Sequence, residues 1–350
     1  MGYRIGFDIG STTIKAVVLD ENNQICYKSY ERHKAQVRQK ALDKLVELKK
    51  YTKEPFKFAI SGSGALGLSE QGELPFVQEV FASATGVSKL YPETDCAIEL
   101  GGEDAKILFF QGSVEQRMNS TCAGGTGAFI DQMATLLNMS LEEMNEASLN
   151  YHRLYPIASR CGVFAKTDIQ PLINQGVDKC DLCASIFQAV VDQTITSLAQ
   201  GRKIEGNILF LGGPLYFMSG LRNRFVETLK LSDVQVNCPD TAINFVALGT
   251  AICADQEYTY DELYKALEDL AHAPAKLTES KPLFESEEDY QKFIERHKSH
   301  DAKYADLKNY AGKAYLGIDS GSTTTKLVLL DENDAILYDS YTSNKGNPLD

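Results

Sequence analysis

A repeat within the chain is the feature that most restricts how it can fold. Residues 5–20 read IGFDIGSTTIKAVVLD and residues 316–331 read LGIDSGSTTTKLVLLD, and the likeness continues into ENNQICYKSY and ENDAILYDSY. The offset is a constant 311 residues in a chain of 350. We therefore expect one whole repeat unit, the start of a second, and a longer protein of which this chain is a fragment. The residues after 313 cannot bury a core alone and are expected to form a dangling hairpin.

Within the first repeat unit the apolar pattern alternates between strands and helices. Residues 4–10, 14–20 and 25–32 are predicted to form a meander of strands, and a strand–turn–strand pattern starts again near residue 95. This restart predicts two similar α/β lobes, about 1–92 and 93–254, with a cleft between them. The other predicted strands are 57–64 and 207–213, and the predicted helices are 40–53, 75–91, 127–138, 162–174, 181–200, 215–229 and 242–254.

Residues 255–312 differ in composition from the rest of the chain. They are rich in Glu, Lys, Asp and His and contain almost no glycine. This composition predicts a helical, solvated connector, after which 313–350 form the truncated start of a second copy.

Charge and cysteine content limit the partners. The net charge of −13 makes nucleic acid an unlikely ligand, although small phosphates can still bind to backbone N–H groups. The start of the chain lacks the pattern of a signal peptide, and no apolar run approaches the ~18–20 residues of a membrane span. We therefore expect a cytoplasmic protein whose eight cysteines stay reduced. Four of them are expected to pack in the core: Cys26, Cys96, Cys238 and Cys253.

The first turn of the chain carries residue types that bind phosphate. Its glycine allows close backbone approach, its hydroxyls and N–H groups can hold phosphate oxygens, and its carboxylate can orient the waters of Mg²⁺. It is not a P-loop, because GxxxxGK[ST] is absent. A hairpin turn that only needs Gly and Ser is the alternative, which the recurrence at Asp319, Gly321, Ser322, Thr323 and Lys326 disfavours. The candidate residues are Asp8, Gly10, Ser11, Thr12, Thr13 and Lys15.

Two further turns follow in the second lobe. Residues 99–104, ELGGED, lie between strands, and their carboxylates can hold Mg²⁺-bound water and position the attacking water for phosphoryl transfer. The candidates there are Glu99, Glu103 and Asp104 as catalytic groups, with Gly101 and Gly102 for binding. Gly212 and Gly213 end an apolar strand and open a helix, which suits an adenosine. Gly125, Thr126 and Gly127 are added as nucleotide-binding candidates.

Two cysteines directly precede predicted helices. Cys122 lies in NSTCAGGTGAFIDQM and Cys161 in ASRCGVFAKTDIQ. A helix N-terminus lowers the pKa of a thiol and stabilises an anionic cluster. A [4Fe–4S] cluster takes four cysteine ligands, so two cysteines from this unit would need two more from a second. Inert thiols near the cleft are the alternative at this point.

Taken together, the three turns resemble the phosphate 1, phosphate 2 and adenosine motifs of the actin, sugar-kinase and heat-shock-chaperone superfamily. More narrowly, residues 3–254 resemble the ATP-dependent activators of 2-hydroxyacyl-CoA dehydratases and the ATPase subunits of benzoyl-CoA reductase. The tandem arrangement is similar to the large activases with two such domains. The resemblance implies an α/β, two-lobed, ribonuclease-H-like fold whose inter-lobe cleft binds ATP.

The resemblance also implies the chemistry. Cys122 matches a CAAGTGRF-like motif and Cys161 a CTVFAESE-like motif, each giving one ligand per subunit to a bridging [4Fe–4S] cluster. ATP and Mg²⁺ would bind in the cleft, and a ferredoxin- or flavodoxin-like donor would supply electrons for a dehydratase- or reductase-type metalloenzyme. A homodimer or an intramolecular pseudo-dimer would complete the cluster. The usual DIGGQD is ELGGED here, so Glu99 replaces Asp and Glu103 replaces Gln, which puts the rate and metal geometry of hydrolysis in question.

Other functions and motifs are weaker. A small-molecule kinase of the same fold would need a carboxylate base beside a sugar-like pocket, for which Glu103 or Asp104 could serve. A non-catalytic, nucleotide-dependent assembly module is the third alternative. The CxxC of Cys180 and Cys183 opens an apolar helix and has no second CxxC, so it is interpreted as coincidence.

Overall fold

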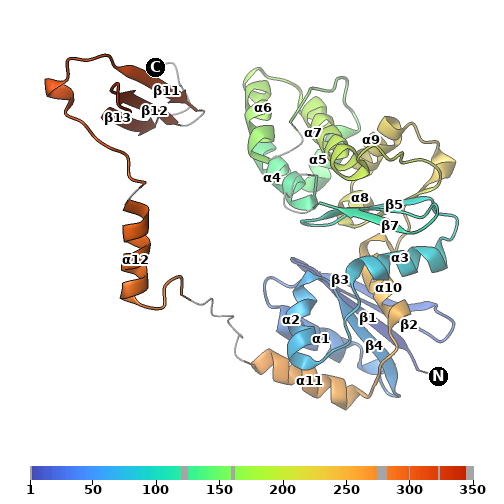
Figure 1. Ribbon diagram of the computed structural model, residues 1–350. Helices are drawn as coiled ribbons and strands as arrows, with labels where there is room; N and C mark the ends of the chain where they lie inside the picture. Colours follow the sequence, from blue (N-terminus) through green and yellow to red (C-terminus); the bar gives the residue numbers. More distant parts are fainter. Residues whose placement is uncertain are drawn as a thin grey trace. The chain divides into compact units, whose positions relative to one another are not determined.

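The computed structural model describes residues 2–119, 125–158, 162–273, 282–298, 300–321 and 324–343. The chain divides into two units, Met1–Pro274 and Ala275–Asp350 (Figure 1). The first unit holds two five-stranded sheets, and the second holds one three-stranded sheet.

Lobe I is built on a sheet of order β10-β4-β1-β2-β3. The first three strands form the predicted antiparallel meander, β4 runs parallel to β1, and β10 runs antiparallel to β4. Both faces of β1 and β2 are covered, which matches their nearly continuous apolar sequences. The strands are β1 (Arg4–Ile9), β2 (Thr13–Leu19), β3 (Ile25–Arg32), β4 (Phe56–Ser61) and β10 (Glu257–Tyr258).

Lobe II repeats this topology with the order β7-β6-β5-β8-β9. A meander again comes first, and β8 pairs parallel with its first strand, although the outer strand β9 is parallel rather than antiparallel. The prediction of two similar α/β lobes is therefore confirmed. The strands are β5 (Cys96–Leu100), β6 (Ala105–Phe109), β7 (Glu115–Met118), β8 (Ile208–Leu211) and β9 (Val236–Asn237).

Helices cover the two sheets in three layers. The outer face of the lobe I sheet packs against α1 (Val37–Glu47) and α11 (Tyr260–His272), with α2 (Leu66–Gly72) beside α11. Lobe II carries α4 (Gly127–Leu137), α5 (Leu141–Ser148), α6 (Gly162–Asn174), α7 (Lys179–Thr194), α8 (Gly213–Phe217) and α9 (Ser219–Leu229). Between the sheets lie α3 (Glu79–Leu90) and α10 (Phe245–Cys253) (Figure 1).

The central layer of α3 and α10 joins the lobes through one apolar cluster. It gathers side chains from β2, from β5, β6 and β8, and from both helices, among them Val17, Val87, Leu108 and Phe245. The helices cross closely, because a Cβ at Gly249 would lie 2.0 Å from the carbonyl oxygen of Ala82. Sequence analysis assigned 242–254 to lobe II, but this helix also packs on β1, β2 and β4.

The longest apolar helix belongs to the core of lobe II. Among the described residues, one helical stretch, Lys179–Ala199, is long and apolar enough to cross a membrane. Buried positions make up 67% of its most apolar window, and Leu182, Ile186 and Val190 lie in the lobe II core. Packing within the lobe therefore accounts for its composition.

The predicted connector over 255–312 begins later than expected. β10 extends the lobe I sheet, and α11 buries Leu263, Leu267 and Leu270 against α1 and the sheet. These leucines recur at helical spacing, but the surrounding charges hid the pattern. A Thr259–Glu262 capping box starts the helix. By contrast, α12 (Glu287–Lys298) has no buried residue in the described part of the chain.

The C-terminal unit reproduces the first meander. It consists of β11 (Tyr315–Ser320), β12 (Thr324–Leu330) and β13 (Ile336–Ser343), so it has one strand more than the expected hairpin. The irregularity between Leu329 and Leu330 matches the one between Val18 and Leu19, at the repeat offset of 311. The repeat is therefore one of register as well as of sequence.

Truncation of a buried leucine tests the place of α11. We expect Leu267→Ala to lower the free energy of unfolding of the N-terminal unit by about 3 kcal/mol, because it opens a cavity in a core position that is 1% exposed. Urea titration followed by circular dichroism measures the change. Leu283→Ala is the control, since Leu283 is 94% exposed; equal effects of the two changes would contradict this packing.

Candidate active site

The first turn is held at both ends by strand pairing. Asp8 and Lys15 are register partners in β1 and β2, and the Gly10 N–H donates to the Thr13 carbonyl at 2.9 Å. The Lys15 ammonium lies 2.7 Å from Asp8 Oδ2, and the Asp8 side chain is only 2% exposed. Ser11 and Thr12 are exposed at the tip, while Thr13 is buried. The turn thus presents hydroxyls and backbone N–H groups outward from a fixed charged base.

One oxygen of Asp8 lacks a protein partner. Oδ1 is buried and has no hydrogen bond within the described residues. The nearby Ser61 hydroxyl is also buried and also lacks one. A Cβ at Gly62 would come within 2.7 Å of this oxygen, and Gly62 has a φ of 96°, so the chain after β4 passes close to Asp8. A buried carboxylate oxygen without a donor fits a hydrated Mg²⁺ ion, whose waters donate hydrogen bonds.

The second turn repeats this arrangement with a different charge balance. Glu99 and Lys106 are register partners in β5 and β6. The Lys106 ammonium is surrounded by three carboxylates, at 2.7 Å from Glu79, 2.9 Å from Asp104 and 3.7 Å from Glu99. The Lys106 side chain is 1% exposed, so lobe II encloses a cation that forms ion pairs with its carboxylate neighbours, although none of these contacts has hydrogen-bond geometry within the described residues.

The acid and the lysine are seven residues apart in each turn. Asp8 precedes Lys15, Glu99 precedes Lys106, and Asp319 precedes Lys326 in the C-terminal unit, where the pair lies at 2.6 Å. Two antiparallel strands joined by a short turn place residues at this separation opposite each other. Strand alternation aligns Lys15 with Val17 and Lys106 with Leu108, and these apolar residues belong to the cluster between the sheets. Both pairs of the N-terminal unit are therefore directed toward the space between the lobes.

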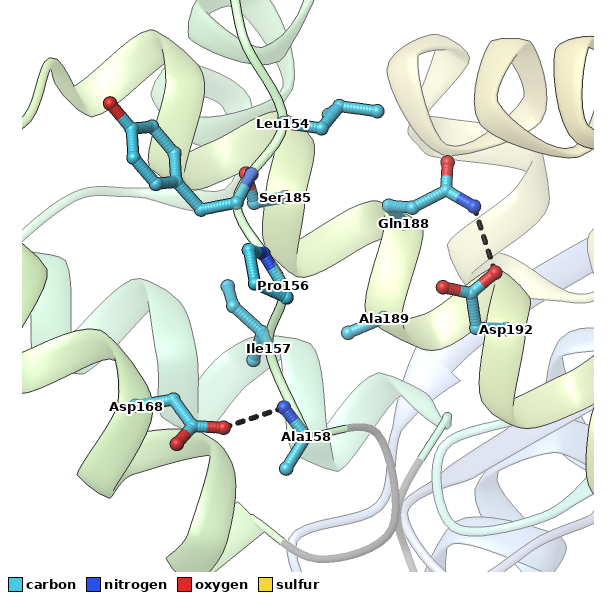
Figure 2. Close-up of a pocket in the computed structure, with 10 residues that line it drawn as sticks. Leu154, Pro156, Ile157, Ala158, Asp168, Ser185, Gln188, Ala189 and Asp192 are labelled. Atoms are coloured by element: carbon cyan, nitrogen blue, oxygen red, sulfur yellow. Dashed lines mark hydrogen bonds between the residues drawn. The ribbon is translucent and has the colours of Figure 1, made fainter.

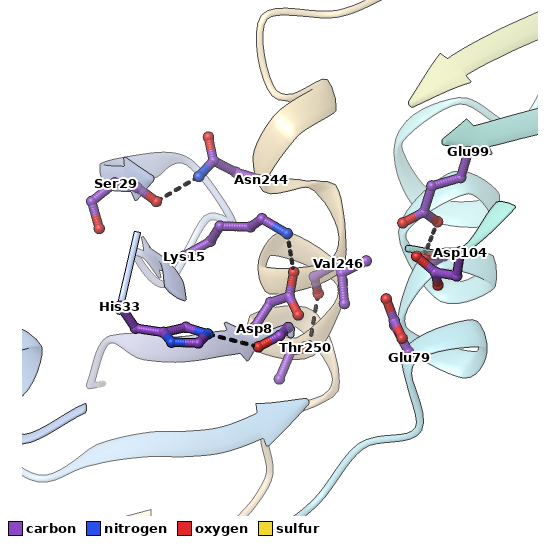
Figure 3. A network of polar contacts seen from close by, with 12 residues as sticks. Asp8, Lys15, Ser29, His33, Glu79, Glu99, Asp104, Asn244, Val246 and Thr250 are labelled. Carbon is purple, nitrogen blue, oxygen red and sulfur yellow. Dashed lines mark hydrogen bonds and ion pairs between the residues drawn. The ribbon is translucent and has the colours of Figure 1, made fainter. Parts of the chain in front are cut away.

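The turns predicted from sequence do meet there. A Cβ at Gly102 would lie 3.4 Å from the Thr12 hydroxyl, so the first and second turns face each other. The N–H groups of Gly127 and Ala128, which begin α4, donate to the carbonyls of Gly101 and Gly102 at 3.0 and 2.8 Å. Figure 3 shows the Asp8–Lys15 pair with Glu79, Glu99 and Asp104 opposite.

The turn at Gly212 and Gly213, predicted to bind adenosine, and residues 125–126 before α4 lie next to this junction. A Cβ at Gly212 would lie 2.0 Å from the Leu100 carbonyl, and Gly213 faces the Tyr30 hydroxyl of lobe I. Thr126 is buried, and Gly125 has a φ of 82°. Glu103 is exposed at the tip of the second turn, whereas Glu99 is buried. The structure thus gathers the described candidates into one region, with Glu103 at its solvent side.

Burial sets the protonation behaviour of these charges. Burial raises the pKa of Glu79 to about 7, although Lys106 opposes the change. Burial likewise raises the pKa of Glu99 against the effect of Lys106. Burial alone would lower the pKa of Lys106, but Glu99, Glu79 and Asp104 raise it overall. Lys15 shows the same balance, in which Asp8 outweighs burial and raises its pKa.

Four residues of the site were missed in the sequence. Glu79 and Ser83 come from α3, and the Ser83 hydroxyl donates to Glu99 at 3.2 Å. His33 is buried and its Nε2 lies 3.0 Å from the Gly10 carbonyl, so it supports the first turn. Lys106 could have been found from the seven-residue spacing. Glu79, Ser83 and His33 carry no local signal, because only tertiary packing brings them to the turns.

The proposed cluster ligands cannot be placed. Cys122 and Cys161 lie outside the described residues, although α6 begins at Gly162, directly after Cys161. Within the described ranges, no group of three or more His, Cys, Asp or Glu is arranged to hold a metal ion. Cys183 is buried with its sulfur 3.9 Å from that of Met139, and burial raises its pKa to about 12.

A separate pocket of about 740 Å³ opens in lobe II. It lies between the segment 154–158, α6 and α7, and Figure 2 shows Asp168 and Asp192 at its edges. The Ala158 N–H donates to Asp168 Oδ2 at 2.7 Å. This contact ties the segment that precedes Cys161 in the sequence to α6.

Two lobes of repeated topology, with facing acid–lysine turns and the predicted adenosine turn beside them, define an ATPase of the actin, sugar-kinase and chaperone fold. The sequence matches the BadF/BadG/BcrA/BcrD ATPase family over residues 5–254. The chain belongs to this family and is an ATPase.

Similar proteins include dehydratase activators. The 2-hydroxyisocaproyl-CoA dehydratase activator of Clostridioides difficile is 27% identical over 266 residues, which cover 74% of this chain and 96% of the relative. The (R)-2-hydroxyglutaryl-CoA dehydratase activating ATPase of Acidaminococcus fermentans is 28% identical over 257 residues, which cover 72% and 96%. One of the subunits of the benzoyl-CoA reductase of Thauera aromatica is 26% identical over 164 residues, which cover 45% and 58%.

Solved structures agree in fold. The activator of the 2-hydroxyisocaproyl-CoA dehydratase from Clostridium difficile, with bound ADPNP, superposes with a TM-score of 0.64 at 26% identity, covering 78% of this chain and 98% of the other. Component A of the Acidaminococcus fermentans (R)-2-hydroxyglutaryl-CoA dehydratase also has a TM-score of 0.64, at 25% identity. The match covers 77% of this chain and 100% of the other. These findings confirm the predicted fold and support ATP as the nucleotide.

The raised pKa of Glu79 predicts a dependence of stability on pH. Because the folded-state pKa of about 7 lies above the ordinary 4.5, the folded chain binds a proton at Glu79 that the unfolded chain has lost in this range. The stability of the wild type relative to Glu79→Gln should therefore fall as the pH rises from about 5 to 7. The difference is measured from the urea unfolding midpoints of both proteins at pH 5, 6 and 7. A constant difference between wild type and Glu79→Gln over this range would contradict the raised pKa of Glu79.

Proposed function

We propose that this chain is a cytoplasmic reductive activase, in which ATP hydrolysis drives an electron from a [4Fe–4S] cluster to a 2-hydroxyacyl-CoA dehydratase-like enzyme or a related reductase. The observation that carries the proposal is the meeting of two acid–lysine turns between lobes of an ATPase. The names of similar proteins, which include dehydratase activators and a component of a benzoyl-CoA reductase, support the choice of acceptor.

In this proposal the first turn binds the phosphates and their metal ion. Asp8 Oδ1, which lacks a protein donor within the described residues, would accept hydrogen bonds from the waters of a bound Mg²⁺. Mg²⁺ would neutralise the charge that develops on the phosphate oxygens. Lys15 is held at the base of the turn by Asp8. The exposed residues Ser11 and Thr12 would contact the phosphate oxygens through their hydroxyls and backbone N–H groups.

The second turn positions the water that hydrolyses ATP. Water adds to the γ-phosphorus while the bond from this phosphorus to the bridging oxygen breaks, giving ADP and phosphate. Asp104 is 34% exposed in its side chain and Glu103 is exposed, so both can reach solvent. Glu99 is engaged by Lys106 and Ser83. We assign Asp104 and Glu103 to contact with the water, and Glu99 to support of the turn.

Cys122 and Cys161 would hold the cluster together with the same pair from a second unit, in a homodimer or an intramolecular pseudo-dimer. Bound there, the cluster would supply a low-potential electron obtained from a ferredoxin- or flavodoxin-like donor. Cys161 directly precedes α6 in the sequence, where a helix dipole stabilises a thiolate, and Cys122 lies five residues before α4. Because α4 also donates two backbone N–H groups to the second turn, it connects the cysteine segment to the nucleotide site.

Metal analysis after anaerobic purification and reconstitution tests the cluster. We expect about four iron and four sulfide per pair of units, and a loss of most of both in Cys122→Ala. Cys26→Ala is the matched control. The prediction that Cys26 packs in the core was wrong, because the residue is exposed near the start of β3 on lobe I, so its replacement should leave cluster loading unchanged.

Two results would contradict the proposal. The cluster would be ruled out if wild-type protein held no iron after reconstitution. It would also be ruled out if Cys122→Ala bound as much iron as the wild type. ATP turnover that requires a hydroxylated acceptor would instead identify a kinase.

A further inference from the structure

Helix α3 is the segment through which the chain passes from lobe I to lobe II. It follows α2 and precedes β5. Its packing side faces α10, where Gly86 lies next to the Phe245 ring, and a Cβ at Gly86 would lie 3.0 Å from that ring. Because α10 packs in turn on β1, β2 and β4, the position of α3 is fixed mainly by lobe I.

The polar side chains of α3 contact lobe II at its phosphate turn. Glu79 is the first residue of the helix, and Ser83 follows one turn later on the same face. Glu79 lies 2.7 Å from the ammonium of Lys106, and Ser83 donates to Glu99 at 3.2 Å. Both members of the Glu99–Lys106 pair therefore have a partner on α3.

We propose that Glu79 is a positioning residue for ATP hydrolysis, which holds Lys106 against Asp104 and so couples the helix between the lobes to the second phosphate turn. Glu79 acts through Lys106 rather than by contact with the nucleotide. A change in the angle between the lobes would move α3 relative to β6 and alter the 2.7 Å contact. The geometry of Asp104 would then depend on the angle between the lobes.

Burial distinguishes this contact from an ordinary surface ion pair. An exposed pair contributes little to stability, but the Lys106 side chain is 1% exposed and Glu79 is 28% exposed. Removal of the Glu79 charge leaves the enclosed ammonium to Asp104 and Glu99 alone. Lys106 is then free to move toward Glu99, at present its most distant partner at 3.7 Å, and Asp104 loses its fixed position.

Steady-state ATPase kinetics at pH 8, where Glu79 is ionised, test the proposal. We expect Glu79→Gln to lower kcat by about 10- to 100-fold, as small displacements of catalytic groups do, with KM for ATP changed less than about threefold. Glu79→Asp keeps the charge and should recover part of kcat. The assay needs no electron acceptor, so its result does not depend on the cluster proposed above.

Two controls separate positioning from general destabilisation. Glu93→Gln removes the same charge from an exposed residue between α3 and β5 and should match the wild type. In the double variant Glu79→Gln with Lys106→Gln, the loss from the Glu79 change should shrink to less than about twofold relative to Lys106→Gln alone. If Lys106→Gln does not fold by circular dichroism, the comparison of Gln and Asp at position 79 decides.

Three outcomes would overturn the proposal. The first is a kcat of Glu79→Gln within twofold of Glu93→Gln. The second is an equal loss in Glu79→Asp and Glu79→Gln together with a matching loss of folded protein. The third is full additivity of the two changes in a folded double variant.

Discussion

The pairing of a carboxylate with a lysine across a strand turn is the interaction on which this molecule depends. In each lobe the first two strands place an acid and a lysine seven residues apart in register, with the side chains directed between the sheets. Each lysine offsets the cost of burying a carboxylate. The two pairs differ in their charged surroundings. Asp8 keeps one oxygen without a donor within the described residues, whereas Lys106 is surrounded by three carboxylates. The first turn is therefore suited to a hydrated cation, and the second to fixed negative charge around a water.

The layer between the sheets makes these turns into one site. Its apolar cluster draws on both sheets and on α3 and α10, so the lobes share a core and the turns at their strand ends lie opposite each other. The close crossing at Gly249 allows α3 to lie flat on α10. From that position its first turn reaches the Glu99–Lys106 pair. The shared apolar core is thus continuous, through the polar contacts of α3, with the second turn, which we propose to position the attacking water.

Local patterns predicted the parts of the structure that local forces determine. The meanders, the turns at 8–15 and 99–106 and the repeat were visible because alternation and turn residues are encoded in neighbouring positions. The role proposed for Glu79 was not visible in the sequence. There Glu79 opens an ordinary helix, and it reaches the second turn only because α3 packs beside lobe II. The place of α11 was missed because charged residues surround its three buried leucines. The cysteine site stays a prediction, because Cys122 and Cys161 lie outside the described residues.

We propose that the buried oxygen of Asp8 that lacks a donor within the described residues receives the hydrated metal ion of the nucleotide. Calorimetric binding of ADPNP with and without Mg²⁺, to the wild type and to Asp8→Asn, tests it most directly. We expect Mg²⁺ to strengthen binding to the wild type, and we expect the variant, still folded and still able to bind the nucleotide alone, to lose this Mg²⁺-dependent gain. An equal gain from Mg²⁺ in the variant would contradict it.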